Sequence, residues 1–253
     1  MGTMIKHVLN VVHIYHMGTF KIPDNLLKQL TSIERKFFWG YNSNRGHNPT
    51  AWLNVCRPTE MGGLDFRDLE KLNLALLTKL SWRICSEPDS LMDQILGSKY
   101  FNTGDLNQNI SAKNCSYNWN ETSKGLHIVQ QNYFMEITNG RKPKIWKDRW
   151  IPGMSHPHTP KNELFRFYEY VEELMLQDTA QWNVSLFSDL FDADISLKFK
   201  SLYIYSIKED HMIWMLAKDG QFSVKNTYKM LTYNDSEVQV NGVTVNKKVW
   251  KAL

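Results

Sequence analysis

The stretch from residue 52 to residue 101 constrains the fold of this chain more than any other part of its sequence. Two adjacent glycines, Gly62 and Gly63, predict a tight turn, because glycine adopts left-handed backbone conformations without steric penalty. Asp65 or Asp68 can then cap a helix that ends before Pro88. Its apolar positions recur at helical spacing: Leu69, Leu72, Leu76, Leu80 and Ile84. The pattern predicts a turn followed by a long amphipathic core helix, and it specifies a shape but no reaction.

The composition permits one large domain or two small ones. The chain has 253 residues, of which 42% are hydrophobic and 13% aromatic, so it can bury a sizeable core. With 22% charged residues it differs from disordered, charge-rich chains. The net charge of +4 is compatible with a nucleic-acid partner, although it is equally typical of ordinary soluble proteins.

Cysteine usage and hydropathy indicate an intracellular protein. Cys56, Cys85 and Cys115 are odd in number and form no C-x-x-C pair, which argues against a disulfide framework and a closed zinc–cysteine site. No apolar run reaches the roughly 18–20 residues of a membrane span. Polar residues such as His7 and Asn10 interrupt the N-terminal apolar segment, so no signal peptide is predicted.

Further helices are predicted on both sides of the central stretch. Residues 4–20 fit a helix or a strand, and we favour the helix. A second helix should start at Pro23 with Asp24 as its cap, and end at Gly40. Others should cover residues 119–131 and 182–191, and Ser223 should cap one more. The apolar stripe expected on the helix after Pro23 is Leu26, Leu27, Leu30, Ile33, Phe37 and Phe38.

Two β-hairpins are predicted from their turn sequences. Asn139 and Gly140 should turn a strand at 133–138 into a returning strand at 143–146. Asp219 and Gly220 should do the same between strands at 213–216 and 222–224. Residues 52–56 fit a short strand, and 233–245 should be a loop. The predicted fold class is therefore α+β, helix-dominated, with two small β-hairpins.

A basic segment with interleaved aromatic residues is the best candidate for a functional surface. Cations that contact phosphates and rings that stack on bases are the features of a nucleic-acid interface. The alternative is a solvated hairpin edge, where lysines discourage pairing with another strand. The candidate residues are Arg141, Lys142, Lys144, Trp146, Lys147 and Arg149.

Motifs for catalysis or metal binding are not evident. The sequence has no P-loop, no G-x-S-x-G and no H-E-x-x-H motif, and no adjacent aspartates of the polymerase type. The pairs His13 and His16, His156 and His158, and Asp192 and Asp194 each lack the further ligands that a metal site needs. We therefore predict no catalytic and no metal-binding residues in this chain.

Four groups of motifs occur in series along the chain. The first is Tyr15-His16-Met17, Phe20-Lys21-Ile22-Pro23 and Phe38-Trp39-Gly40. The second is Trp52, Cys56, Pro58, Gly62-Gly63-Leu64, Phe66-Arg67-Asp68-Leu69, Asn73, Ala75-Leu76-Leu77, Lys79, Trp82-Arg83, Ser90-Leu91 and Lys99-Tyr100-Phe101. The third is Ser116-Tyr117, Trp119, Asn139-Gly140, Ile145-Trp146, Asp148 and Trp150-Ile151-Pro152. The fourth is Trp214, Asp219-Gly220, Phe222-Ser223-Val224-Lys225, Tyr228 and Trp250-Lys251.

In this order and spacing, the motifs resemble plant LINE-type (non-LTR) retrotransposon reverse transcriptase polyproteins, in the region after the polymerase palm. The resemblance implies that 1–150 is a thumb-like helical region, with the hairpin near 133–147. Pro152, Gly153, Pro157 and Pro160 indicate a linker at 151–162, and the residue composition predicts that 163–253 begins as an acidic helical segment. The resemblance implies that this segment leads, at about 211–253, into the truncated start of a zinc-binding domain. This chain departs from the family at Asp65, where glycine is usual, and at Asn226 and Thr227, where serine and alanine are common.

The resemblance also sets expectations about function. It implies a catalytically inactive fragment of an RNA-directed DNA polymerase polyprotein that binds RNA or an RNA–DNA hybrid weakly. No membrane association is expected, and the family implies an intracellular, nuclear location. The family polymerase uses Mg²⁺, its catalytic aspartates lie upstream, and the zinc ligands would follow Leu253, so no cofactor is expected here. The alternatives are a domesticated protein-interaction module, with unknown protein partners, and an active reverse transcriptase or ribonuclease H-related enzyme.

Overall fold

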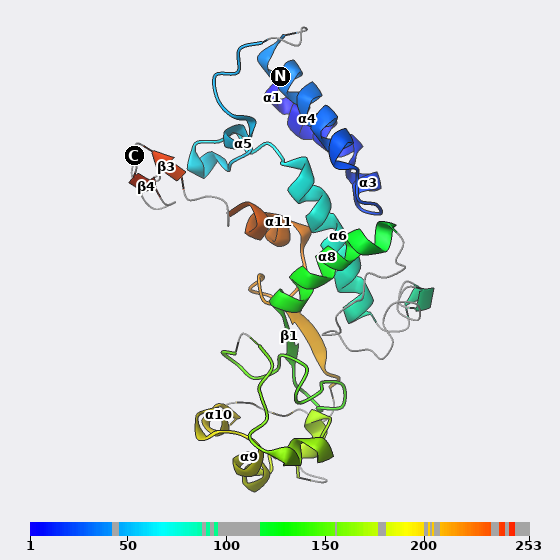
Figure 1. Ribbon diagram of the computed structural model, residues 1–253, viewed down its shortest axis with the longest axis vertical. Coiled ribbons are helices and arrows are strands. Elements are labelled where there is room, and N and C mark those ends of the chain that lie inside the picture. Colours follow the sequence, from blue (N-terminus) through cyan, green and yellow to red (C-terminus); the bar gives the residue numbers. More distant parts are fainter. Residues whose placement is uncertain are drawn as a thin grey trace. The chain divides into compact units, whose positions relative to one another are not determined.

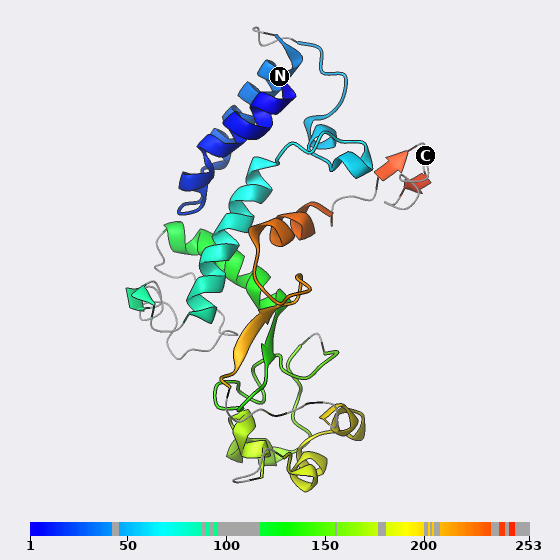
Figure 2. The same cartoon turned by 180° about the vertical axis from the view of Figure 1, so that it is seen from behind.

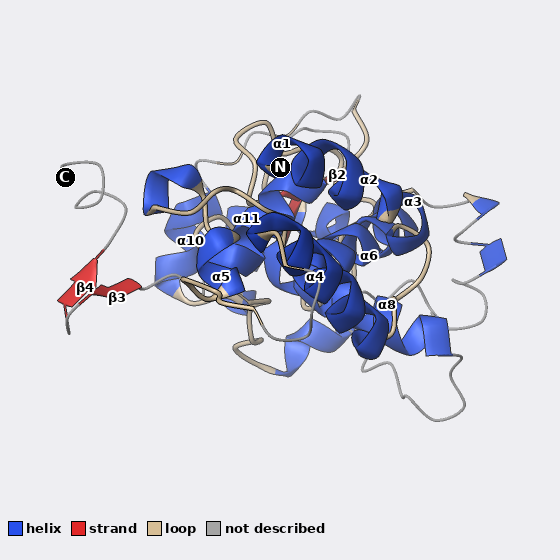
Figure 3. Ribbon diagram, turned by 90° about the horizontal axis from the view of Figure 1, so that it is seen from above, coloured by secondary structure: helices blue, strands red, loops and turns tan. Residues whose placement is uncertain are grey.

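The computed structural model confirms the mixed, helix-dominated α+β class (Figure 1). Among the residues that the structure describes, helices account for most of the backbone, and the strands are few and short (Figure 3). The structure describes residues 1–41, 46–87, 90–91, 94–95, 117–154, 156–176, 181–199, 202, 204, 208–233, 238–240 and 243–245. The Lys99-Tyr100-Phe101 motif, Cys115 and the Trp250-Lys251 motif lie outside these residues.

The chain divides into two compact units, each built from separate segments. Unit 1 comprises Met1–Ser81, Lys113–Leu126 and Ser223–Leu253, and unit 2 comprises Trp82–Ala112 and His127–Phe222. The linker predicted at 151–162 lies within unit 2. Among the described residues, no helix has both the length and the apolar character required to cross a membrane.

Unit 1 begins with an almost continuous helical segment, as predicted for residues 4–20. It consists of α1 (Gly2–Met4), a π-helical turn η1 (Ile5–Leu9), α2 (Asn10–Val12) and α3 (Ile14–Met17). The next helix, α4 (Asp24–Trp39), lies beside this segment in Figures 1 and 2. The helix α4 ends as predicted at Gly40, whose φ of 70° is left-handed. Asp24 does not cap the helix; its carboxylate pairs with Lys21 instead.

The buried face of α4 differs from the predicted apolar stripe. Leu27 is buried, but Leu26 and Ile33 are 44% and 56% exposed. The inward face instead carries Glu34, which is 2% exposed and accepts a hydrogen bond from Asn10 Nδ2 at 2.9 Å. The second carboxylate oxygen of Glu34 has no hydrogen-bond partner. The predicted stripe is right for Leu27, and also for Leu30, Phe37 and Phe38, which pack against buried clusters of unit 1. The pattern of apolar residues could not anticipate a carboxyl group in the core.

This burial makes the stability of the chain depend on pH. Burial raises the pKa of Glu34 from 4.5 to about 7, so the folded chain holds a proton that the unfolded chain releases. The contribution is full below pH 4.5 and is lost as the pH rises through about 7. The free energy of unfolding of the wild-type chain should therefore fall by about 3 kcal/mol over this pH range. We expect urea unfolding at several pH values to show that Glu34→Gln lacks this decrease. Glu70→Gln, at an exposed position on the same unit, is the control; equal pH profiles for the two variants would contradict the assignment.

The central stretch contains two residues with a left-handed backbone conformation. Residues 52–56, predicted as a strand, form the single-turn helix α5 (Trp52–Val55), because without a neighbouring strand the Cys56 amide bonds the Trp52 carbonyl at 3.0 Å. After the 3₁₀ turn η2 (Thr59–Met61), Gly62 has a φ of 77°. Asp65 has a φ of 57°, a left-handed conformation that glycine adopts more easily than aspartate.

The helix α6 (Leu69–Ser86) matches its prediction, and Asp68 is its cap. The Asp68 carboxylate accepts from the amides of Glu70 at 3.0 Å and Lys71 at 3.3 Å. The helix α8 (Tyr117–Asn132) crosses α6 closely in Figures 1 and 2. At this crossing a Cβ on Gly125 would lie 2.8 Å from Ser81 Oγ, so only glycine fits without displacement.

The last elements of unit 1 follow Ser223. Its hydroxyl accepts from the Asn226 amide at 3.1 Å and caps α11 (Val224–Tyr233), as predicted. Beyond α11, a hairpin of β3 (Val238–Val240) and β4 (Val243–Val245) replaces the predicted loop. Alternating β-branched valines favour strands, and this signal was overlooked in a segment judged by its polarity.

Unit 2 is built on a strand pair that joins distant segments. The strand β1 (Tyr133–Glu136) is confirmed, but it pairs with β2 (His211–Trp214) and not with 143–146. The pairing is antiparallel, with Tyr133 opposite Trp214. Both hairpin assignments are therefore wrong, because the first strand of one predicted hairpin pairs with the first strand of the other. Gly140 and Gly220 still take the left-handed conformations expected of the two turns.

The rest of unit 2 consists of short helices around an aromatic core. They are the 3₁₀ turns η4 (Glu163–Phe167) and η5 (Val171–Leu174) and the helices α9 (Val184–Leu190), which was predicted, and α10 (Ala193–Phe199). Trp150, Phe187 and Phe191 are almost fully buried. Tyr170 bridges to Lys144, which draws residues 143–145 towards η5.

Candidate functional site

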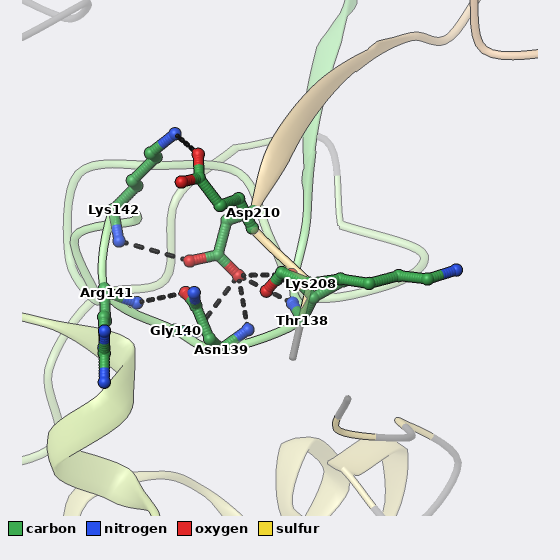
Figure 4. Close-up of polar contacts among 8 residues, drawn as sticks. Thr138, Asn139, Gly140, Arg141, Lys142, Lys208 and Asp210 are labelled. Atoms are coloured by element: carbon green, nitrogen blue, oxygen red, sulfur yellow. Dashed lines mark hydrogen bonds and ion pairs between the residues drawn. The ribbon is translucent and has the colours of Figure 1, made fainter. Parts of the chain in front are cut away.

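The basic candidate segment forms a loop that leaves β1 and closes around one carboxylate, that of Asp210 (Figure 4). Asp210 Oδ1 accepts from the amides of Thr138 at 2.6 Å, Asn139 at 2.9 Å and Gly140 at 3.0 Å, and Oδ2 accepts from the Lys142 amide at 3.2 Å. Asp210 is 3% exposed. Its carboxylate therefore fixes the backbone from which the basic side chains project.

The charge state of Asp210 follows from these contacts. Burial alone would raise the pKa of this carboxyl, but hydrogen bonds from the four backbone amides outweigh burial and lower the pKa. Asp210 is thus an anion at neutral pH. The negative charge is satisfied by backbone dipoles, so the cations of the loop are left to find other partners.

Three of the predicted cations pair with glutamates from elsewhere in unit 2. Lys142 Nζ lies 2.6 Å from Glu209, and Lys144 Nζ lies 2.8 Å from Glu169. Arg141 Nε lies 3.5 Å from Glu172. The partnered lysines lower the pKa of Glu169 and Glu209 through hydrogen bonds and charge. The pairs made by Arg141 and Lys142 are exposed, and because exposed ion pairs are weak, a phosphate can displace their glutamates at small cost. In the third pair the Lys144 side chain is only 19% exposed.

Two other candidate residues support the loop from inside. Arg149 is 7% exposed and donates to the carbonyls of Gln130 and Gln131, and burial lowers its pKa. Trp146 donates through Nε1 to the Tyr168 carbonyl at 2.9 Å and stacks on Phe191, with ring centroids 5.1 Å apart. Both side chains make contacts that stabilise the fold, whereas the Lys147 side chain is exposed.

Metal binding has no support in the described part of the chain. No group of three or more His, Cys, Asp or Glu side chains comes together there in a way that could hold a metal ion. His156 donates from Nδ1 to the neighbouring Pro157 carbonyl at 3.0 Å, and His158 stacks on Phe191. These histidines act in turn geometry and in packing.

Asp210 is the central residue that the sequence did not reveal. It lies about seventy residues from the loop that it organises, and nothing in its local sequence distinguishes it from a solvated carboxylate. The available signal was the turn at Asn139 and Gly140, whose several free amides require an acceptor. The glutamates that pair with the loop were likewise missed, because they come from an acidic segment without a motif.

Two Arabidopsis thaliana proteins are similar to this chain. One is named "Putative ribonuclease H protein" and is 26% identical over 242 residues, which cover 92% of this chain and 39% of that protein. The other is named "Uncharacterized mitochondrial protein" and is 35% identical over 140 residues, which cover 54% of this chain and 91% of that protein. The chain therefore spans about two fifths of the first relative and most of the second. No protein-family profile and no solved structure matches it.

Proposed function

This chain belongs to the family of the Arabidopsis mitochondrial protein, and we propose that it is a catalytically inactive segment of a plant retroelement polyprotein that binds RNA or an RNA–DNA hybrid. The main support for the proposal is the similarity of nearly the whole chain to a protein that is named as a putative ribonuclease H, an enzyme class that acts on RNA. The four motif groups in series support a LINE-type reverse transcriptase origin, in the part that follows the polymerase palm.

The proposed contact surface consists of Arg141, Lys142, Lys144 and Lys147, presented by the loop around Asp210. These cations would bind backbone phosphates in exchange for their glutamate partners. Arg149 and Trp146 would hold the loop in shape and would not touch the ligand. Such a surface would recognise the charge of the phosphates and not the base sequence. The expected binding is therefore weak and strongly dependent on salt.

The test is fluorescence anisotropy with a labelled RNA and a labelled RNA–DNA hybrid, at about 50 mM and 200 mM salt. We expect binding at the lower salt and a marked loss at the higher salt. The variant Arg141→Gln, Lys142→Gln, Lys147→Gln should bind more weakly than the control Lys28→Gln, Lys79→Gln, Lys218→Gln, which removes as many exposed cations elsewhere. Absence of binding at low salt would refute the proposal.

A further inference from the structure

Unit 1 contains a hollow of about 630 Å³ between residues 56–72 and one face of α11. Its apolar wall includes Leu72, Val224 and Tyr228. The Tyr228 hydroxyl accepts from the Asp68 amide at 2.8 Å, and its ring packs against a buried cluster of unit 1. Burial raises the pKa of Tyr228 to about 12, so the hydroxyl stays neutral. The two walls are therefore joined by a hydrogen bond.

Three cations line this hollow without partners. The exposed side chains of Arg67, Lys225 and Lys229 form no hydrogen bond and no ion pair in the described part of the chain. Glu60 and Asp65 also line the hollow, so cations outnumber anions by three to two. Lys225 and Lys229 are four residues apart on α11, where like charges weaken a helix. An anion bound between them would relieve that repulsion.

The backbone that presents these cations is fixed although their side chains are free. The Arg67 amide donates to Asn10 Oδ1 at 3.2 Å, and Asn10 is fully buried and donates in turn to Glu34. Ser223 caps the first turn of α11 ahead of Lys225. A ligand would therefore order these three side chains but would not need to order the backbone.

We propose that this hollow binds one nucleotide of a single-stranded nucleic acid. Arg67, Lys225 and Lys229 contact its phosphate, and the base lies against Val224 and Tyr228. Glu60 or Asp65 accepts a hydrogen bond from an amino group of the base. The volume lies within the range of roughly 300–1,000 Å³ that is usual for small-ligand sites. The inference rests on the proposed nucleic-acid function but concerns a second surface, since the basic loop lies in unit 2.

The test uses the full chain and a labelled single-stranded RNA. We expect Arg67→Gln, Lys225→Gln, Lys229→Gln to weaken binding at least tenfold, whereas the control Lys28→Gln, Lys79→Gln, Lys218→Gln should change it less than about twofold. The slope of log affinity against log salt should fall in magnitude by about 0.7, because the hollow neutralises one phosphate of a single strand. Circular dichroism verifies that each variant is folded.

A competition arm identifies the chemistry of the hollow. Adenosine monophosphate should displace the RNA at lower concentration than inorganic phosphate does, because only the nucleotide also contacts the apolar wall. Equal competition by the two anions would overturn the nucleotide assignment. If the wild-type chain binds RNA and the Arg67, Lys225, Lys229 variant binds like the control variant, the hollow is not the site while the proposed function stands. If the wild-type chain binds no RNA, both proposals fail.

Discussion

Replacing Asp210 by alanine is expected to destabilise unit 2 by about 4 kcal/mol or more. The substitution leaves four backbone amides, those of Thr138, Asn139, Gly140 and Lys142, without the acceptor that they share. A buried donor without a partner costs about 1–3 kcal/mol, so even partial rescue by water leaves a large deficit. Hydrogen exchange provides the local measurement: these four amides should lose their protection before the strand pair β1–β2 does.

The matched control for this prediction is the neighbouring carboxylate, Glu209. Its side chain is 78% exposed and, among the residues that the structure describes, pairs with Lys142 alone, so Glu209→Ala removes the same charge at little cost. Asp210→Asn should be intermediate, because a neutral amide oxygen can still accept from three of the amides. Protection of the loop that is unchanged in Asp210→Ala would contradict the role assigned to Asp210.

Acid should remove the same stabilisation. Because the pKa of Asp210 is lowered in the folded chain, its contribution is present above the pKa of an unfolded aspartate. That contribution is lost as the pH falls through the folded pKa. The difference in stability between the wild-type chain and Asp210→Ala should therefore shrink at acid pH, in the opposite sense to the Glu34 effect.

The sequence predicted best those features that depend on neighbouring residues. Gly40 and Gly62 adopt left-handed backbone where helices or turns end, and Ser223 caps the helix that it precedes. The helix α6 follows its apolar spacing over its full length. Each of these features depends on local hydrogen bonds and sterics, which a stretch of a few residues specifies by itself.

Features that depend on distant partners could not be predicted in this way. The turn at Asn139 and Gly140 formed, but the strand before it paired with β2, about 75 residues further on. Local turn chemistry gives the conformation of a turn and does not choose between competing strands. The buried position of Glu34 on α4 was missed for a related reason, since its partner, Asn10, comes from a different helix.

The same limit applies to the candidate site. The sequence identified a basic, aromatic segment, and the cations are found in one loop around Asp210. Which of them are paired depends on Glu169, Glu172 and Glu209, none of which is near the segment in sequence. Lys225 and Lys229 were present at helical spacing on a predicted helix, but their relation to Arg67 appears only when the chain is folded.

Asn73 is the counterpart of Asp210 in unit 1. Its side chain projects from α6, is fully buried, and forms three hydrogen bonds with the turn between α3 and α4. Oδ1 accepts from the Ile22 amide at 2.8 Å, and Nδ2 donates to the carbonyls of Met17 at 2.8 Å and Phe20 at 2.9 Å. One amide side chain thus satisfies three backbone groups that have left regular helix.

Asn73→Ala is accordingly expected to destabilise unit 1 by about 4 kcal/mol, because three backbone groups lose their partner and a small cavity opens. Asn54→Ala is the matched control, since the side-chain amide of Asn54 donates, within the described part of the chain, to the exposed Thr50 hydroxyl alone, at 3.1 Å. Urea unfolding of the two variants measures the difference, and hydrogen exchange at the Ile22 amide places it in the turn. Equal losses in the two variants would show that the turn is held by its apolar contacts. A selective loss at Asn73 would instead explain why an asparagine, and not one more leucine, interrupts the buried face of this helix.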